Sequence, residues 1–192
     1  MKIIPLADSE DLLIETLKSG GVVVIPTDTI YGLSCRSDCP EAILRIHKFK
    51  GSNPKKPLIL LASDLLMVEK YSLLTVKQRE RAEKLWAEEK PSSLILKQKK
   101  APDEILIPNQ DSLAWRLPKS PFLLKIIRAL KVPLVSTSFN KTNQAHFKSL
   151  VGIQDLLKGE DNLDLLVDGG VLEGEPSRLI DLSGDSEKII RP

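Results

Sequence analysis

The chain has 192 residues, of which 42% are hydrophobic and 28% charged, a composition typical of a globular protein with a sizeable core. Its formal net charge is only +2, which excludes nucleic-acid binding through bulk positive charge and requires any RNA or nucleotide contact to come from a local cluster. The sequence shows no charged-then-apolar leader and no apolar run approaching about 18 residues, so we expect neither a signal peptide nor a membrane span and predict a cytoplasmic protein.

The first half of the chain alternates between predicted helices and strands. Helices are expected at 9–18, 41–50, 63–71 and 75–89, and strands at 21–25 and 57–62. The strand at 21–25 is an unbroken Val/Ile run after Gly21, which indicates burial on both faces. Pro40 and Gly51 flank the second helix as its start and end require, and Thr75 with Gln78 predicts a capping box on the fourth.

The second half continues the alternation. Strands are expected at 93–97, 113–117, 133–137, 163–167, 178–182 and 188–191, and a helix at 121–130, with the longest loops at 97–108 and 140–149. No internal repeat is present. The pattern predicts one α/β domain spanning residues 1–192, built on a mixed twisted sheet with flanking helices.

The cysteines and histidines do not predict a metal site. Cys35 and Cys39 are the only cysteines, and His47 and His146 the only histidines, whereas a structural zinc site needs four converging ligands. Two unrelated thiols in a reducing compartment is the better interpretation.

Polar and basic residues collect where predicted strands end, which is where α/β sheets usually build sites. They are found in the stretches 26–31 and 50–57, at Arg116, in the stretch 136–140, and at Ser177 and Arg191. Each alone has an ordinary explanation as a turn, a cap or solvated surface. Together, the basic heads, glycine turns and hydroxyls supply the donors that a polyphosphate needs. A P-loop, a dinucleotide-binding fold and a Ser-His-Asp or Cys-His hydrolase do not explain the set, because their motifs are missing.

Several stretches resemble the YrdC-type threonylcarbamoyl-AMP synthases, in that family's order and at about its spacing. They are GGVVVIPTDTIYGLSC, HKFKGSNPKKPLILL, LAWRLPKSP, VPLVSTSFN, VDGG and EPSRLIDLSG, followed by the closing IIRP. The resemblance implies the short single-domain form, with a twisted mixed α/β sheet and a concave electropositive surface. It also implies a nucleotidyltransferase that condenses L-threonine, bicarbonate and ATP into threonylcarbamoyl-adenylate and releases pyrophosphate.

The resemblance implies site residues position by position. On the threonine and carbamate side these are Thr27, Tyr31, Arg116, Ser136 and Ser177, and on the ATP side Lys50, Ser138 and Arg191; Lys50, Ser138 and Asn140 are implied to be catalytic. Because the reaction joins two anions, the protein mainly has to align them and offset their charge, so no side-chain nucleophile is required. Mg²⁺ on the phosphates, held largely by substrate oxygens and water, is the implied cofactor. The implied partners are proteins that transfer the threonylcarbamoyl group to the adenosine beside the anticodon of certain tRNAs.

The loop after Lys50 departs from the family pattern. Family members usually read Lys-Gly-Arg-Pro there, whereas this chain places Ser52 at the arginine position. Serine cannot replace a forked cation at a phosphate. Two alternatives remain: Lys55 or Lys56 supplies the charge, or a shifted register gives Lys48 and Lys50 the two basic roles.

Two further departures are smaller. The turn after Trp86 has two extra residues and no glycine, although Ser93 keeps a hydroxyl, and a bulky Phe139 stands where alanine is common. The departures motivate a second hypothesis, a catalytically impaired paralogue that binds tRNA or double-stranded RNA. The modest charge and sparse aromatic residues count against it. A third hypothesis, an enzyme that uses another carbamoyl source, usually involves additional domains that 192 residues cannot hold.

Overall fold

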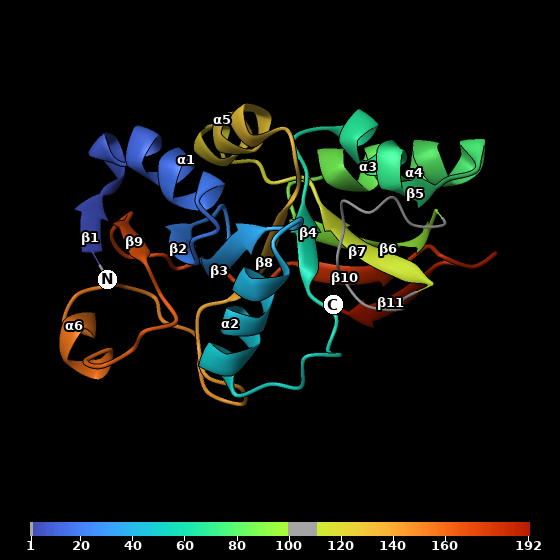
Figure 1. Ribbon diagram of the computed structural model, residues 1–192. Coiled ribbons are helices and arrows are strands. Elements are labelled where there is room, and N and C mark those ends of the chain that lie inside the picture. The colour runs from blue at the N-terminus through green and yellow to red at the C-terminus, as the bar shows by residue number, and fades with distance from the viewer. Residues whose placement is uncertain (1, 100–110) are drawn as a thin grey trace.

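The computed structural model describes residues 2–99 and 111–192. Its strands are β1 (Lys2–Pro5), β2 (Val23–Pro26), β3 (Tyr31–Arg36), β4 (Ile59–Leu61), β5 (Ser72–Leu73), β6 (Ser92–Gln98), β7 (Ser112–Arg116), β8 (Leu134–Ser138), β9 (Leu165–Asp168), β10 (Arg178–Asp181) and β11 (Lys188–Arg191). Its helices are α1 (Glu10–Lys18), α2 (Pro40–Lys50), α3 (Leu65–Tyr71), α4 (Val76–Ala87), α5 (Pro121–Leu130) and α6 (Ile153–Leu156), with a 3-10 turn at Leu6–Asp8. Figure 1 shows the helices flanking a strongly twisted sheet.

The strands form one mixed sheet in the order β1-β9-β2-β3-β8-β4-β7-β6-β10-β11, with β5 paired to β6. The pairs β1–β9, β2–β9, β4–β7 and β6–β10 are parallel, and the remaining pairs are antiparallel. This arrangement confirms the predicted α/β class with a mixed twisted sheet and flanking helices. Among the described residues, no helix combines the length and apolar character needed to cross a bilayer.

Most predicted elements are present within one or two residues, and α5 and β11 match their expected bounds. The Thr75–Gln78 capping box is also confirmed. Five elements have no counterpart among those predicted from the sequence: β1, β3, β5, the 3-10 turn and α6. Of the expected long loops, 140–149 contains neither helix nor strand; 97–108 begins inside β6, and its residues from 100 onward lie outside the described residues.

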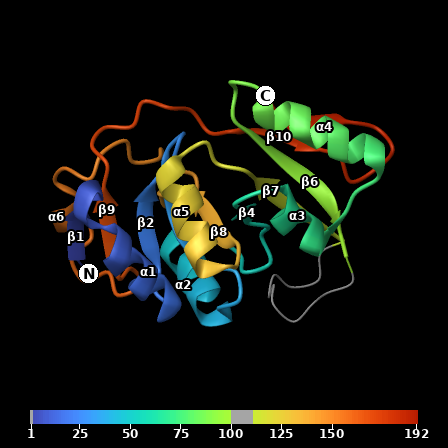
Figure 2. The same cartoon turned by 90° about the horizontal axis from the view of Figure 1, so that it is seen from above.

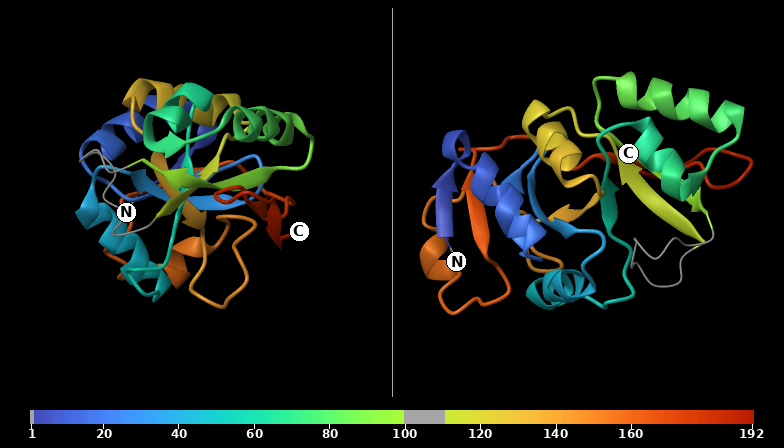
Figure 3. Two further views of the ribbon diagram at one scale, coloured as in Figure 1. Left: turned by 90° about the vertical axis from the view of Figure 1, so that its right-hand side faces the viewer. Right: turned by 45° about the horizontal axis from the view of Figure 1, so that its top comes forward.

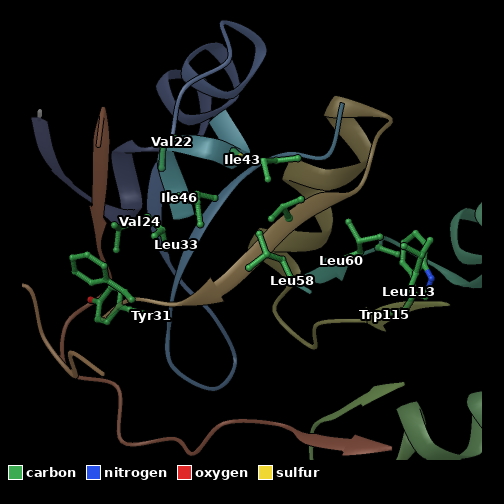
Figure 4. Close-up of a cluster of buried hydrophobic side chains, with 14 of the residues drawn as sticks. Val22, Val24, Tyr31, Leu33, Ile43, Ile46, Leu58, Leu60, Leu113 and Trp115 are labelled. Atoms are coloured by element: carbon green, nitrogen blue, oxygen red, sulfur yellow. The ribbon is translucent and has the colours of Figure 1, made fainter. Parts of the chain in front are cut away.

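Strand β2 is buried on both faces, as its Val/Ile run predicts. Val23 and Ile25 pack with the side chains of α1 and α5, whereas Val24, together with Val22 just before the strand, joins the opposite cluster with residues of α2 (Figure 4). Figure 2 shows α1 and α5 side by side over this end of the sheet, and Figure 3 shows α4 at the other end. Alternate residues of one strand therefore feed two cores, because successive side chains point to opposite faces.

The face of the sheet that packs against α1 and α5 is apolar at β2 and β8, but toward β7 and β6 it carries smaller side chains. Leu134 of β8 belongs to the apolar cluster there, but Ser136, two residues later, begins a cross-strand row with Ile59, Ala114 and Ile95. Serine and alanine are too small to fill the space above the sheet. The sequence of these central strands thus leaves a hollow on one face.

Candidate functional site

Two adjoining cavities lie over this hollow. The smaller one, about 150 Å³, is lined by Thr27, Thr29, Ile30, Tyr31, Gly32, Ile59, Leu61, Arg116, Ser136, Thr137, Ser138, Pro176, Ser177 and Arg191. The larger one, about 420 Å³, is lined by Lys50, Lys56, Pro57, Leu58, Ile59, Ile95, Ser112, Ala114, Ser136, Thr137, Ser138, Asn140, Thr142, Asn143, Leu179 and Arg191. The larger volume falls within the roughly 300–1,000 Å³ that is usual for small-molecule sites.

All predicted site residues line one or both of these cavities. Thr27, Tyr31, Arg116 and Ser177 line the smaller cavity, Lys50 and Asn140 the larger, and Ser136, Ser138 and Arg191 both. Ser136, Ser138 and Arg191 therefore lie where the two cavities meet, and the other predicted residues are divided between the cavities. The chemical role of each residue stays a prediction.

Gly32 on β3 opens the floor of the smaller cavity. A Cβ atom at this position would lie 2.7 Å from Oγ of Ser136 and 3.2 Å from Cγ2 of Thr27, too close for an unstrained contact. Ser34, two residues along the strand, donates to Oγ of Ser136 at 3.0 Å. Gly32 is not among the residues predicted from the sequence, although a glycine inside a strand often marks a close approach of this kind.

Thr27 shapes the turn between β2 and β3. Its hydroxyl donates to the carbonyl of Ile30 at 2.7 Å and accepts from the backbone N–H groups of Thr29 and Ile30 at 3.1 and 3.2 Å. These bonds form the local side-chain-to-backbone pattern that serine and threonine favour in turns. Thr27 therefore contributes its backbone position and its methyl group to the wall of the smaller cavity.

The Arg116 guanidinium is buried behind this turn. It donates from Nη2 to Oδ1 of Asp28 at 2.9 Å and from Nη1 to Oγ1 of Thr29 at 2.8 Å, while the residue is only 6% exposed. Burial lowers the pKa of Arg116, and the Asp28 carboxylate opposes that shift. Its Nε atom is buried and has no hydrogen-bond partner within the described part of the chain. Arginine nevertheless stays charged, so the smaller cavity has a fixed cation in its wall.

Tyr31 directs its phenol into the core. The hydroxyl accepts from the backbone N–H of Gly169 at 2.9 Å and donates to the carbonyl of Gly170 at 2.8 Å, with Asp168 nearby. Burial raises the pKa of this hydroxyl. Tyr31 thereby anchors the start of the segment 169–177, whose far end supplies Pro176 and Ser177 to the smaller cavity.

Lys50, the last residue of α2, connects the predicted stretch 50–57 to the predicted stretch 136–140. Its ammonium donates to the carbonyls of Ser138 and Asn140 at 2.8 and 3.1 Å and to Oδ1 of Asn140 at 2.7 Å. The residue is 6% exposed, and burial, together with the charge of Lys56, lowers the pKa of Lys50 to about 8. Oδ1 of Asn140 also accepts from the Ser138 hydroxyl at 2.7 Å.

The far wall is held by Ser177 and Arg191. Arg191 donates from Nε and Nη2 to the carbonyl of Ser177 at 3.0 and 2.7 Å, and the hydroxyls of Ser177 and Ser93 are 2.8 Å apart. Ser93, the hydroxyl residue that follows the longer turn after Trp86, therefore positions Ser177. Phe139 is fully buried and stacks on Phe49 with ring centroids 5.6 Å apart, so its bulk serves the core.

Neither cavity is lined by an aspartate or glutamate among the residues that the structure describes. Those residues also include no group of three or more His, Cys, Asp or Glu side chains placed to hold a metal ion. Cys35 and Cys39 are free thiols, and burial raises the pKa of Cys35. The lining of both cavities is therefore suited to anions.

Another hollow, about 590 Å³, lies between α4 and the turn at 182–187. It contains none of the predicted residues. Its Arg81 already pairs with Glu187, at 2.7 and 3.0 Å. The two adjoining cavities are thus the better candidate site.

A family model named Sua5/YciO/YrdC, with the description "Telomere recombination", matches residues 15–192. The threonylcarbamoyl-AMP synthase of Psychromonas ingrahamii is 32% identical over 161 residues, which is 82% of this chain and 83% of that protein. The protein of the same name from Rattus norvegicus is 32% identical over 154 residues, 80% of this chain but 53% of its own length. This chain thus spans about half of the rat protein. The solved structure of a double-alanine variant of P. abyssi Sua5 matches all of this chain and 60% of that one, with a TM-score of 0.86 and 25% identity.

Proposed function

The chain belongs to the Sua5/YciO/YrdC family, and on that premise we propose that it is a threonylcarbamoyl-AMP synthase. The observation that carries the proposal is the pair of adjoining cavities, which share Ser136, Ser138 and Arg191 and divide the remaining predicted residues between them. A reaction that joins an amino acid to a nucleotide needs two such neighbouring compartments. The curated relatives at 32% identity support the same reaction by name.

In the proposed reaction the smaller cavity holds L-threonine and the larger one ATP. The threonine amine takes up bicarbonate as a carbamate with loss of water, and a carbamate oxygen then attacks the α-phosphorus of ATP. The bond from that phosphorus to the β-phosphate bridging oxygen breaks, which yields threonylcarbamoyl-adenylate and pyrophosphate. Magnesium enters with ATP as part of the substrate complex.

The residues of this chain act by alignment and charge. Arg116, fixed by Asp28 and Thr29, faces the carboxylate or carbamate of the amino acid. Lys50 and Arg191 offset the charge of the phosphates, and the Ser138 hydroxyl lies where the two cavities meet. Preorganised donors of this kind stabilise charge that develops during phosphoryl transfer without a covalent intermediate. The product is passed on to partner proteins that modify tRNA.

The test is a synthesis assay with purified protein, Mg–ATP, labelled bicarbonate and L-threonine. We expect pyrophosphate and a labelled adenylate, both dependent on threonine, and D-threonine serves as the matched control. Pyrophosphate release that is the same with and without threonine contradicts the proposal. Absence of ATP binding, together with salt-dependent binding of tRNA, would instead favour the RNA-binding paralogue.

A further inference from the structure

The loop 51–57, between α2 and β4, is folded by contacts of its own residues. Oγ of Ser52 lies 2.9 Å from Nδ1 of His47, and the backbone N–H of Ser52 donates to the carbonyl of the same histidine at 3.0 Å. Asn53 then organises a turn, because its Oδ1 accepts from the N–H of Lys55 and its carbonyl from the N–H of Lys56, both at 2.9 Å. The side chain of Ser52 is thus engaged with α2, and Asn53 sets the direction of the lysines that follow.

The three exposed lysines near this loop are placed differently. Lys56 lines the larger cavity together with Lys50 and Arg191. Lys55 and Lys48 are also exposed, but they are not among the residues that line either cavity. The charge of Lys56 reaches Lys50, since it adds to burial in lowering the pKa of that ammonium.

The charge of the larger cavity is one-sided. Its described lining contains Lys50, Lys56 and Arg191 and no carboxylate. Lys50 directs its ammonium to neutral oxygens, and no ion pair of Lys50 occurs within residues 2–99 and 111–192. Like charges held together in a partly desolvated space disfavour one another. An anion with more than one negative charge relieves this repulsion.

We propose that Lys56 is the second phosphate-binding cation of the larger cavity, acting with Lys50 on the polyphosphate of a nucleoside triphosphate. The inference deepens the proposed function and rests on it for the identity of the nucleotide. It selects Lys56 over Lys55 and over a Lys48–Lys50 pair. A lysine on an exposed flexible stem acts as a point charge, so its contribution should weaken as salt rises.

The test measures binding of inorganic tripolyphosphate and of Mg–ATP by calorimetry for the unaltered protein, Lys56→Met and the matched control Lys55→Met. At low salt we expect Lys56→Met to lower the affinity for both ligands roughly five- to tenfold and to make that affinity less dependent on salt. Lys55→Met should change either affinity by less than about twofold. Removing Lys56 should also shift the pH midpoint of tripolyphosphate binding upward, because Lys50 loses a neighbouring positive charge. This shift reports only that the Lys56 charge acts on Lys50, so contact of Lys56 with the phosphates is judged by the loss of affinity relative to Lys55→Met.

Equal losses in the two variants, or unchanged binding in Lys56→Met, overturn the inference. The proposed function fails separately. If tripolyphosphate binding depends on Lys56 but no threonine-dependent adenylate forms, Lys56 remains a phosphate-binding residue and the synthase assignment falls. If synthesis proceeds in Lys56→Met with an unchanged KM for ATP, the assignment stands and the role of Lys56 falls.

Discussion

The ammonium of Lys50 lies 2.7 Å from Oδ1 of Asn140, although the two residues are 90 positions apart in the chain. The same Oδ1 accepts from the Ser138 hydroxyl, and Nδ2 of Asn140 donates to the carbonyl of Gln144 at 2.6 Å. The end of α2 is thereby tied to the end of β8 through a neutral amide. A carboxylate in place of that amide would neutralise Lys50 and leave less positive charge for a ligand.

Asn140→Asp tests this relationship. We expect the pKa of Lys50 to rise, because a carboxylate now faces its ammonium, and binding of tripolyphosphate to weaken by about tenfold or more at neutral pH. Asn143→Asp is the matched control, since it adds the same charge to the lining of the larger cavity from an exposed position. Calorimetry and the pH midpoint of binding provide the readouts. Identical effects of the two substitutions would show that the contact with Lys50 has no special role.

The pKa of Lys50, about 8, predicts a pH-dependent stability. Because this pKa is depressed below the value of an unfolded lysine, the unfolded chain binds more protons between about pH 8 and 10.5, and the Lys50 contribution to stability rises with pH through that window. Below pH 8 the penalty for burying the charge is fully present. The full change amounts to about 3 kcal/mol.

The measurement is the free energy of unfolding from pH 7 to 10.5 for the unaltered protein and for Lys50→Met, since subtraction removes the other titrating groups. The unfolding free energy of the unaltered protein should increase relative to that of Lys50→Met as pH rises. If the difference between the two free energies does not change with pH, the pKa of Lys50 is not lowered by its environment. Phosphate binding should show the opposite trend and weaken above about pH 8, because neutral Lys50 attracts no anion.

Gly32→Ala should close the smaller cavity while sparing the larger one. The added Cβ would lie 2.7 Å from Oγ of Ser136, so that side chain or β3 must shift. We expect the KM for threonine to rise at least about tenfold, with ATP affinity changed less than about twofold. Gly184→Ala is the control, because a Cβ there meets nothing within 4 Å. Equal losses of threonine and ATP binding would place both ligands in the same space.

Asp28→Asn should destabilise the protein, because Asp28 holds Arg116 in the wall of the smaller cavity. The substitution removes the carboxylate that pairs with the buried Arg116 at 2.9 Å, and a buried pair that loses one partner costs about 3 kcal/mol. Asp38→Asn, which breaks the more exposed pair with Arg36, should cost less than about 1 kcal/mol. Chemical denaturation checks both values. An Asp28→Asn variant as stable as the original would show that Arg116 does not depend on Asp28.

The order and type of most elements could be predicted from local signals. The Val/Ile run of β2, the Pro and Gly that flank α2 and the capping box of α4 are all confirmed, because each depends on neighbours within a few residues. Strand β3 was missed because YGLSCR lacks the apolar run that marks a buried strand. It becomes a strand only when β2 and β8 pair with it on either side.

The candidate site likewise combines features that the local sequence predicts with features that depend on tertiary packing. The types of residue that bind phosphate and carboxylate can be recognised in the sequence, and all of the predicted ones line the two cavities. The sequence could not show that the Tyr31 hydroxyl is taken up by Gly169 and Gly170, or that Ser52 turns toward His47. These contacts depend on tertiary packing.

By itself, then, the sequence determined the α/β alternation, the stock of donors and the absence of a nucleophile motif, since these depend on residue identity and short-range spacing. Only the tertiary structure decided that Ser136, Ile59, Ala114 and Ile95 form one cross-strand row beneath the cavities. It also decided that Lys56, and not Lys55, lines the larger cavity together with Lys50. The physical reason is that strand register and loop folding join residues far apart in the chain through long-range hydrogen bonds and packing, which no local pattern specifies.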